Sequence, residues 1–289
     1  MRAIFRSNDP ADTGLRFAEL YTKALDRLGD PRPPMRVGAL RTLEALGQDH
    51  PERRQAIVDV FCAYLRMPAG EDGPLRLTAA RILTDHLRPS APGFWGGVNV
   101  DLTGATLADC DLSGCRVDGG LRLDYAVLLG AAKFRGLVVG GPTSLRGTTF
   151  YDHAWLERAV FRGPARFDAA TFHADAWFGE ATFAARTTFA AAEFGGHAWF
   201  GGCSFRGPVD FGEATFRRSA GFRGAVAHSG VALRGTTFLG PARVSRRDER
   251  WNVTAPGWRV VVDPDNASVG QLLWVAHPEL VEQPEQTPT

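Results

Sequence analysis

An apolar residue recurs through the middle of this chain at intervals of five or six residues. The interval is five from Leu102 to Val117 and then alternates between six and five as far as Val244. We call the positions of this series the centre positions. Because the period lies between five and six residues, the series gives no continuous face to an α-helix. It predicts short strands that turn at corners and wind into a solenoid. Twelve successive centre positions are phenylalanines: Phe161, Phe167, Phe172, Phe178, Phe183, Phe189, Phe194, Phe200, Phe205, Phe211, Phe216 and Phe222.

Small residues stand two positions before most centre positions. Ala170 precedes Phe172 and Ala181 precedes Phe183 in this way. Residues two apart on an extended chain point to the same side, so each pair is expected to face the core together. The residue between them, such as Thr182, is expected to face outward.

The cysteines follow the same rule of packing. Cys110, Cys115 and Cys203 all occupy the small position two residues before a centre position, and the chain contains no CxxC motif. One register accounts for all three, so they are predicted to be reduced thiols that fill the core, and Cys110 and Cys115 are not predicted to be a redox pair.

A second period of 22 residues runs through the same region. Trp155, Trp177 and Trp199 are 22 residues apart, and each stands immediately before a centre position. Two residues before each tryptophan stand His153, Asp175 and His197, with the same period. A coil of 22 residues, made of two 11-residue halves, explains why alternate halves differ. Residues 94–244 are then expected to form about seven coils and a rod roughly 30–35 Å long.

The repeat resembles the pentapeptide-repeat family, whose motif is A(D/N)LXX. Residues 101–112, with the sequence DLTGATLADCDL, are similar to this motif, and the later Ala-Thr-Phe units at 170–172 and 181–183 are similar to its phenylalanine-rich variant. The resemblance implies a mainly β fold, a right-handed quadrilateral β-helix with four short faces per coil. The family norm is a strict interval of five, so two corners of each coil are expected to carry one extra residue.

The segment before the repeat is predicted to be an α-helical, HEAT-like cap domain over residues 15–90, preceded by a disordered N-terminus at 1–14. Helical spacing of apolar residues predicts four helices: Leu15–Leu28, Met35–Leu46, Pro51–Leu65 and Leu75–Leu87. The helix around Arg36–Leu46 resembles the segment that precedes pentapeptide repeats in many actinobacterial proteins. Transmembrane helices often come before that segment in those proteins.

The segment after the repeat is predicted to be a β-hairpin cap at residues 245–278. Two strands are expected, Trp258–Val262 and Gln271–Val275, because a solenoid end leaves strand edges that a cap must cover. Residues 279–289 are expected to be disordered.

The distribution of charged residues along the chain indicates a cellular location and excludes some classes of partner. No stretch free of Asp, Glu, Lys and Arg reaches 18 residues, and the first 14 residues show no apolar run, so a cytoplasmic location without transmembrane helix or signal peptide is expected. The formal net charge is +1, which argues against nucleic-acid binding driven by bulk charge. Residues 94–244 carry 13 acidic and 15 basic side chains. That balance argues against DNA mimicry, the role that the family implies for quinolone-resistance proteins that bind gyrase.

The tryptophan column is the main functional candidate. Outward-facing indoles at strand spacing would form an apolar stripe, which monomers seldom expose. Three interpretations are open: an interface with a partner or a second copy, a surface covered by the helical domain or the tail, and simple stabilisation of the ladder.

The column of His153, Asp175 and His197 contains residue types that serve in metal sites and acid–base clusters. Ser219 takes the next place in the column and no nucleophile accompanies it, so a solvated corner column is predicted. No catalytic residue, metal or cofactor is predicted. The expected function is a non-catalytic scaffold for contact with an unknown protein partner or in a homodimer. The alternative is a gyrase-binding DNA mimic.

Overall fold

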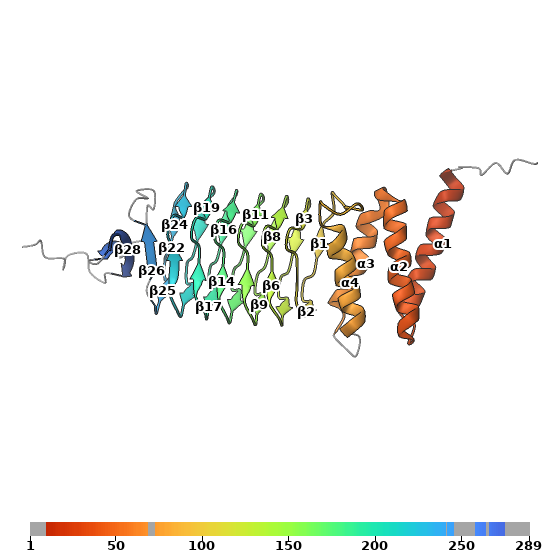
Figure 1. Cartoon of the computed structure of the whole chain (residues 1–289), viewed down its shortest axis with the longest axis horizontal. Coiled ribbons are helices and arrows are strands. Elements are labelled where there is room, and N and C mark those ends of the chain that lie inside the picture. The colour runs from red at the N-terminus through yellow and green to blue at the C-terminus, as the bar shows by residue number, and fades with distance from the viewer. Residues whose placement is uncertain (1–9, 69–72, 241, 246–257, 264–265, 275–289) are drawn as a thin grey trace, which may run out of the picture.

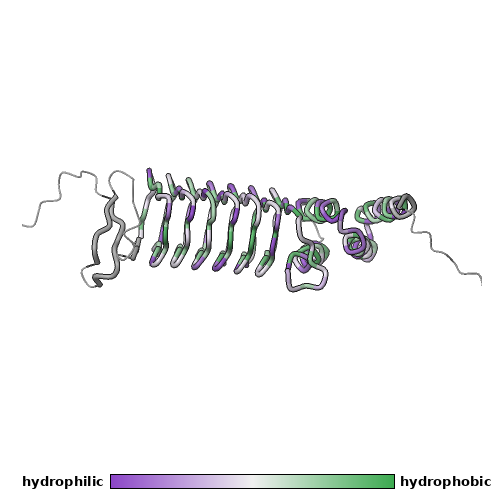
Figure 2. The backbone as a smooth tube through the Cα atoms, turned by 90° about the horizontal axis from the view of Figure 1, so that it is seen from above, coloured by the Kyte–Doolittle hydropathy of each residue, from purple (hydrophilic) through white to green (hydrophobic). Residues whose placement is uncertain are grey.

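The computed structural model describes residues 10–68, 73–240, 242–245, 258–263 and 266–274. Helices occupy one end of an elongated molecule, stacked coils form the middle, and a hairpin lies at the other end (Figure 1). Seen from above, the coils are parallel rungs of one rod (Figure 2). The β-solenoid and the helices before it confirm the predicted fold class.

Four α-helices precede the solenoid: α1 (Pro10–Leu28), α2 (Pro33–Asp49), α3 (Arg54–Arg66) and α4 (Gly73–His86), with a short 3-10 helix at Pro51–Arg53. Helix α1 begins five residues before the predicted start at Leu15. Pro10 suits the first turn of a helix, where backbone N–H groups have no intrahelical acceptor and a missing N–H loses no hydrogen bond. Residues 10–14 contain no apolar periodicity, so the sequence does not indicate this turn. The expected disorder therefore does not extend over residues 10–14, and residues 1–9 lie outside the described residues.

Four parallel sheets, which we call A to D, form the sides of the solenoid. Sheet A consists of β1 (Val100–Asp101), β4 (Leu121–Arg122), β8 (Thr143–Ser144), β12 (Ala165–Arg166), β16 (Thr187–Thr188), β20 (Val209–Asp210) and β24 (Val231–Ala232). Sheet B consists of β2 (Thr106–Leu107), β5 (Val127–Leu128), β9 (Thr149–Phe150), β13 (Thr171–Phe172), β17 (Glu193–Phe194), β21 (Thr215–Phe216) and β25 (Thr237–Phe238).

The other two sides are built in the same way. Sheet C contains β6 (Ala132–Lys133), β10 (Ala154–Trp155), β14 (Ala176–Trp177), β18 (Ala198–Trp199), β22 (Ala220–Phe222) and β26 (Ala242–Ser245). Sheet D contains β3 (Arg116–Val117), β7 (Val138–Val139), β11 (Val160–Phe161), β15 (Thr182–Phe183), β19 (Ser204–Phe205) and β23 (Val226–Ala227).

The coil length follows from the strand register. Ala165 pairs with Thr187, and Thr187 with Val209, so each step is 22 residues as the tryptophan spacing predicts. Sheet A takes six such steps from Val100 to Val231, the first of them 21 residues long. The solenoid thus has about six turns rather than the expected seven, because residues 94–99 belong to the junction with the helices.

Two kinds of corner alternate around each coil. The corners before sheets A and C carry the extra residue that makes the interval six. The corners after sheets A and C contain a residue with positive φ, such as Gly147 (φ 59°), Ala169 (φ 53°) and Glu180 (φ 59°). Glycine enters this left-handed region freely, whereas other residues pay a steric cost.

The solenoid core is a set of stacked phenylalanine rings. All twelve phenylalanines from Phe161 to Phe222 are at most 1% exposed. In sheet B the rings of Phe150, Phe172, Phe194, Phe216 and Phe238 stack with neighbouring centroids 4.5–4.9 Å apart. Rings of adjacent columns meet edge to face, so each ring is fixed both along and across the rod.

The helices close the first coil through Trp95. This side chain is fully buried, and its ring stacks on His86 with centroids 4.2 Å apart. A Cβ at Gly47 would stand 2.6 Å from the indole, so only glycine leaves room for it. Buried Arg76 donates to the carbonyl oxygens of Leu65 and, at 2.8 Å, of Thr106 in β2. The helical domain therefore packs directly on the solenoid.

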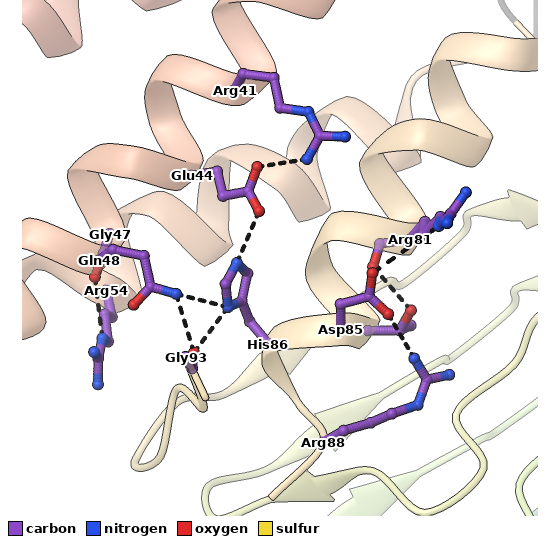
Figure 3. Close-up of polar contacts among 11 residues, drawn as sticks. Arg41, Glu44, Gly47, Gln48, Arg54, Arg81, Asp85, His86, Arg88 and Gly93 are labelled. Atoms are coloured by element: carbon purple, nitrogen blue, oxygen red, sulfur yellow. Dashed lines mark hydrogen bonds and ion pairs between the residues drawn. The ribbon is translucent and has the colours of Figure 1, made fainter. Parts of the chain in front are cut away.

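A polar network supports the same junction (Figure 3). The Nδ1 atom of His86 lies 2.8 Å from the carbonyl oxygen of Gly93, and Nε2 lies 3.1 Å from the Glu44 carboxylate. The Gln48 side chain donates to the same Gly93 carbonyl at 3.3 Å. The loop that leads into the first coil is thus fixed by residues of α2 and α4.

The hairpin extends sheet C at the far end. Strand β26 pairs in parallel with β22 and antiparallel with β28 (Asn266–Trp274), which in turn pairs with β27 (Trp258–Asp263). The two strands predicted for the cap are present, and the second begins earlier than predicted, at Asn266. Residues 246–257, 264–265 and 275–289, including the expected disordered tail, lie outside the described residues.

We predict that Phe183→Ala lowers the free energy of unfolding by about 3–5 kcal/mol, because it empties a fully buried site between Phe161 and Phe205. Its neighbour Thr182 faces outward, so Thr182→Ala is expected to cost well under about 1 kcal/mol. Urea unfolding followed by circular dichroism measures both. Equal costs at the two sites would contradict the assignment of inward and outward faces.

We also predict that Ala169→Gly stabilises the protein by about 0.5–1 kcal/mol, because Ala169 holds a φ of 53° that glycine adopts without strain. The matched control is Ala170→Gly at the adjacent buried residue, which removes a packed methyl group and is expected to cost about 1–2 kcal/mol. Thermal unfolding of the two variants checks the prediction. Destabilisation of similar size in both would show that the corner conformation is not strained.

Candidate interaction surface

The three tryptophans form one outward column on sheet C. The register pairs Trp155 with Trp177 and Trp177 with Trp199 in adjacent strands. The rings of Trp155 and Trp177 lie 6.1 Å apart at 30°, and the side chain of Trp199 is 41% exposed. We call these three residues the tryptophan stripe.

The residues at the two ends of the stripe shape it. Lys133 pairs with Trp155 in the preceding coil, and Gly221 pairs with Trp199 in the following one. A Cβ at Gly221 would meet the Trp199 ring at 2.6 Å, so the indole lies directly on the backbone of the next coil. The stripe therefore ends at Gly221, which has no side chain to continue the column of indoles.

Histidines flank the stripe. The ring of His153 lies 4.9 Å from that of Trp177 and 6.2 Å from that of Trp155, and His197 lies 6.0 Å from Trp199. These contacts hold the indoles in one arrangement, so the surface is ordered before any partner binds.

Sequence reasoning missed a second aromatic pair beside this column. Tyr151, which is 54% exposed, stacks on His173 with centroids 4.9 Å apart, at the corner that leads into sheet C. The two residues are separated by 22 positions, the same period that revealed the tryptophans. That spacing was the available signal, but a tyrosine paired with a histidine does not repeat one residue type and so escapes notice.

The column of His153, Asp175 and His197 makes structural corner contacts. The Asp175 carboxylate accepts a hydrogen bond from the backbone N–H of His197 at 2.7 Å. The His197 ring is hydrogen-bonded to the hydroxyl of Ser219. Within the described residues, no group of three or more His, Cys, Asp or Glu side chains is placed to hold a metal ion. These bonds link one coil to the next through Asp175, His197 and Ser219, whereas His153 packs against the ring of Trp177.

The described elements leave the stripe uncovered. The helices pack on the end of the solenoid, and the hairpin continues sheet C along the rod instead of lying across its outer face (Figure 1). In the described part of the chain, neither the helices nor the hairpin covers the stripe, so the second of the three interpretations is not supported there.

All four cysteines are free thiols. Burial raises the pKa of Cys62, Cys110 and Cys115 to about 12 and raises the pKa of Cys203 further. The Cys203 thiol donates to the Phe178 carbonyl inside the core. Because a thiolate is the reactive and metal-binding form, these groups are suited to filling space rather than to chemistry.

Part of the repeat matches a known protein family. A family model described as pentapeptide repeats (9 copies) matches residues 123–171 and 200–246. These two segments of the solenoid consist of pentapeptide repeats. Between the two matched segments the phenylalanine core continues without a break, since Phe178, Phe183, Phe189 and Phe194 each stack on the phenylalanine of a neighbouring coil. No curated protein and no solved structure matches the chain.

The resemblance to actinobacterial proteins also raises the question of transmembrane helices. Among the helices of the described residues, none has the length and apolar composition needed to cross a bilayer.

Proposed function

We propose that this pentapeptide-repeat protein is a non-catalytic contact module that binds protein through the tryptophan stripe. The observation that carries the proposal is an ordered column of partly exposed indoles on one side of a rigid rod. Tryptophan is among the residues most enriched in the energetically dominant centres of protein interfaces.

The order of the stripe favours binding. Each tryptophan belongs to a strand that is hydrogen-bonded to the coils on both sides, and its ring packs on a neighbouring ring or on Gly221. A partner would therefore pay little conformational entropy to immobilise these side chains. Tyr151 and His173 add a second aromatic pair at the corner that leads into sheet C.

The geometry of the rings indicates the class of partner. Trp155 lies against Trp177, and Trp199 lies against the backbone of Gly221, so each indole already has a neighbour on one side. A planar ligand needs an open ring face on which to stack, whereas a protein surface packs against edges equally well. The stripe thus suits an apolar protein surface, either on a second copy of this chain or on another protein.

Charged side chains at the corner that follows sheet C form pairs of opposite sign. Arg135 lies 2.7 Å from Glu157, and Arg158 lies 2.9 Å from Glu180. A mixed polar rim is typical of protein interfaces. A DNA mimic needs a continuous acidic face instead, so these pairs give no support to the gyrase-binding alternative.

We predict that Trp177→Asp abolishes contact through the stripe, because a charge would have to be desolvated at its centre. The expected loss of affinity is about 30-fold or more, the level of an interface hot spot. Self-association is measured by sedimentation velocity of the full chain over a range of concentrations. Association with other proteins is measured by quantitative affinity capture from native cytosol.

The matched control is Thr182→Asp, which places the same charge on sheet D of the same coil. It is expected to leave both measurements unchanged. If Trp177→Asp is folded by circular dichroism and yet alters neither self-association nor capture relative to Thr182→Asp, the stripe is not a contact surface.

A further inference from the structure

The first coil of the solenoid is one residue short. Thr106 pairs with Val127, a step of 21 residues, whereas Arg116 pairs with Val138, a step of 22. The missing residue belongs to the corner between sheets B and C, where the interval from Leu107 to Leu112 is five rather than six. Asp109 turns this shortened corner with a φ of 51°, a conformation that no described residue adopts in the later corners before sheet C.

A cavity of about 360 Å³ lies at this shortened corner, between the first coil and helix α4. Its walls include the buried side chains of Leu65 and Leu83 from the helices and Leu102, Leu107 and Leu112 from the coil. A smaller apolar groove of about 140 Å³ continues from it along α4 and shares several of the same wall residues.

The side chains explain why this space is unfilled. The centre positions of the first coil are all leucine or valine, whereas the larger phenylalanine first appears at Phe134 and fills every centre position from Phe161 to Phe222. Helix α4 presents the small residue Ala80 to both parts of the space. A short corner, smaller centre residues and an alanine on the facing helix therefore coincide at one place.

The lining indicates what the cavity would hold. No aromatic residue lines it, and its buried lining residues are all leucines, with Ala80 and Cys110 partly exposed beside them. The interior therefore matches an aliphatic chain rather than a stacked ring. Its volume falls within the range of small-molecule pockets, about 300–1,000 Å³, and such pockets often lie between domains.

Polar groups of both signs stand at the mouth. Arg88 and Arg81 of the α4 region both face Asp85, at 2.7 and 4.0 Å (Figure 3). Across the mouth, Asp109 and Asp111 form no ion pair with any other described side chain. The mouth thus offers guanidinium donors and carboxylate acceptors to one small polar head group.

We propose that this cavity is a binding site for a short aliphatic chain that carries a small polar head, with the chain among the leucines and the head at the charged mouth. The site is separate from the tryptophan stripe, which lies on sheet C further along the rod.

The test uses 1-octanol and the full chain. Isothermal titration calorimetry is expected to show saturable binding of one molecule, and titration followed by methyl NMR is expected to shift Leu83 and Leu107 but not Leu145, which is buried in a later coil. Absence of binding overturns the proposal, as does binding that leaves Leu83 and Leu107 unshifted.

Ala80→Phe fills the space from α4 and is expected to weaken octanol binding at least tenfold, while Ala184→Phe, more than three coils away, changes it less than twofold. Ala108→Trp, at an exposed position on the cavity edge, serves as a second blocking variant should Ala80→Phe fail to fold. Unchanged affinity in a folded blocking variant overturns the site. Equal or tighter binding of 2-phenylethanol overturns the assignment to aliphatic chains.

Discussion

Each coil of this solenoid is hydrogen-bonded to the coils before and after it. The 22-residue step of that pairing determines which side chains stack on one another along the rod. The N–H of Phe178 donates to the carbonyl of Trp199, and the same bond repeats around the coil and along the rod. A fixed step places like positions on top of one another, so a phenylalanine meets a phenylalanine at about 5 Å. Neither the strands, only two residues long in most cases, nor the rings would be ordered without their neighbours.

The two candidate sites lie where the solenoid departs from its regular repeat, one in an outward column of sheet C and one at the first coil. Tryptophan in an outward column of sheet C gives the stripe, and Gly221 ends it. The missing residue near Asp109 gives the cavity against α4. The two ends are closed differently: Trp95 is sealed under the helices, whereas β28 continues the hydrogen bonding of sheet C.

Sequence alone predicted what depends on the period and missed what depends on contacts between distant segments. The buried position of Phe183 and the coil length follow from spacing, because residues one period apart in the sequence of a solenoid are neighbours in space. The hairpin strands follow instead from two runs of β-favouring residues on either side of a turn. The stack of His86 on Trp95 does not, since it joins a helix to a loop with no shared repeat. The cavity was missed for a related reason. The interval of five at Leu107 is visible in the sequence, but the facing helix is needed to see that it leaves a space.

The most direct test of the 22-residue coil is a pair of internal deletions compared by thermal unfolding. Deleting residues 166–187 removes one whole coil and places Thr188 and Phe189 where Arg166 and Phe167 stood, so every later column keeps its face. Deleting residues 166–185 removes 20 residues, the length of four strict pentapeptides, and puts Thr187 in the core place of Phe167. We predict that the first variant keeps a cooperative transition within a few degrees of the parent, and that the second melts far lower or does not fold. Equal stability of the two variants, or greater stability of the second, would contradict the account.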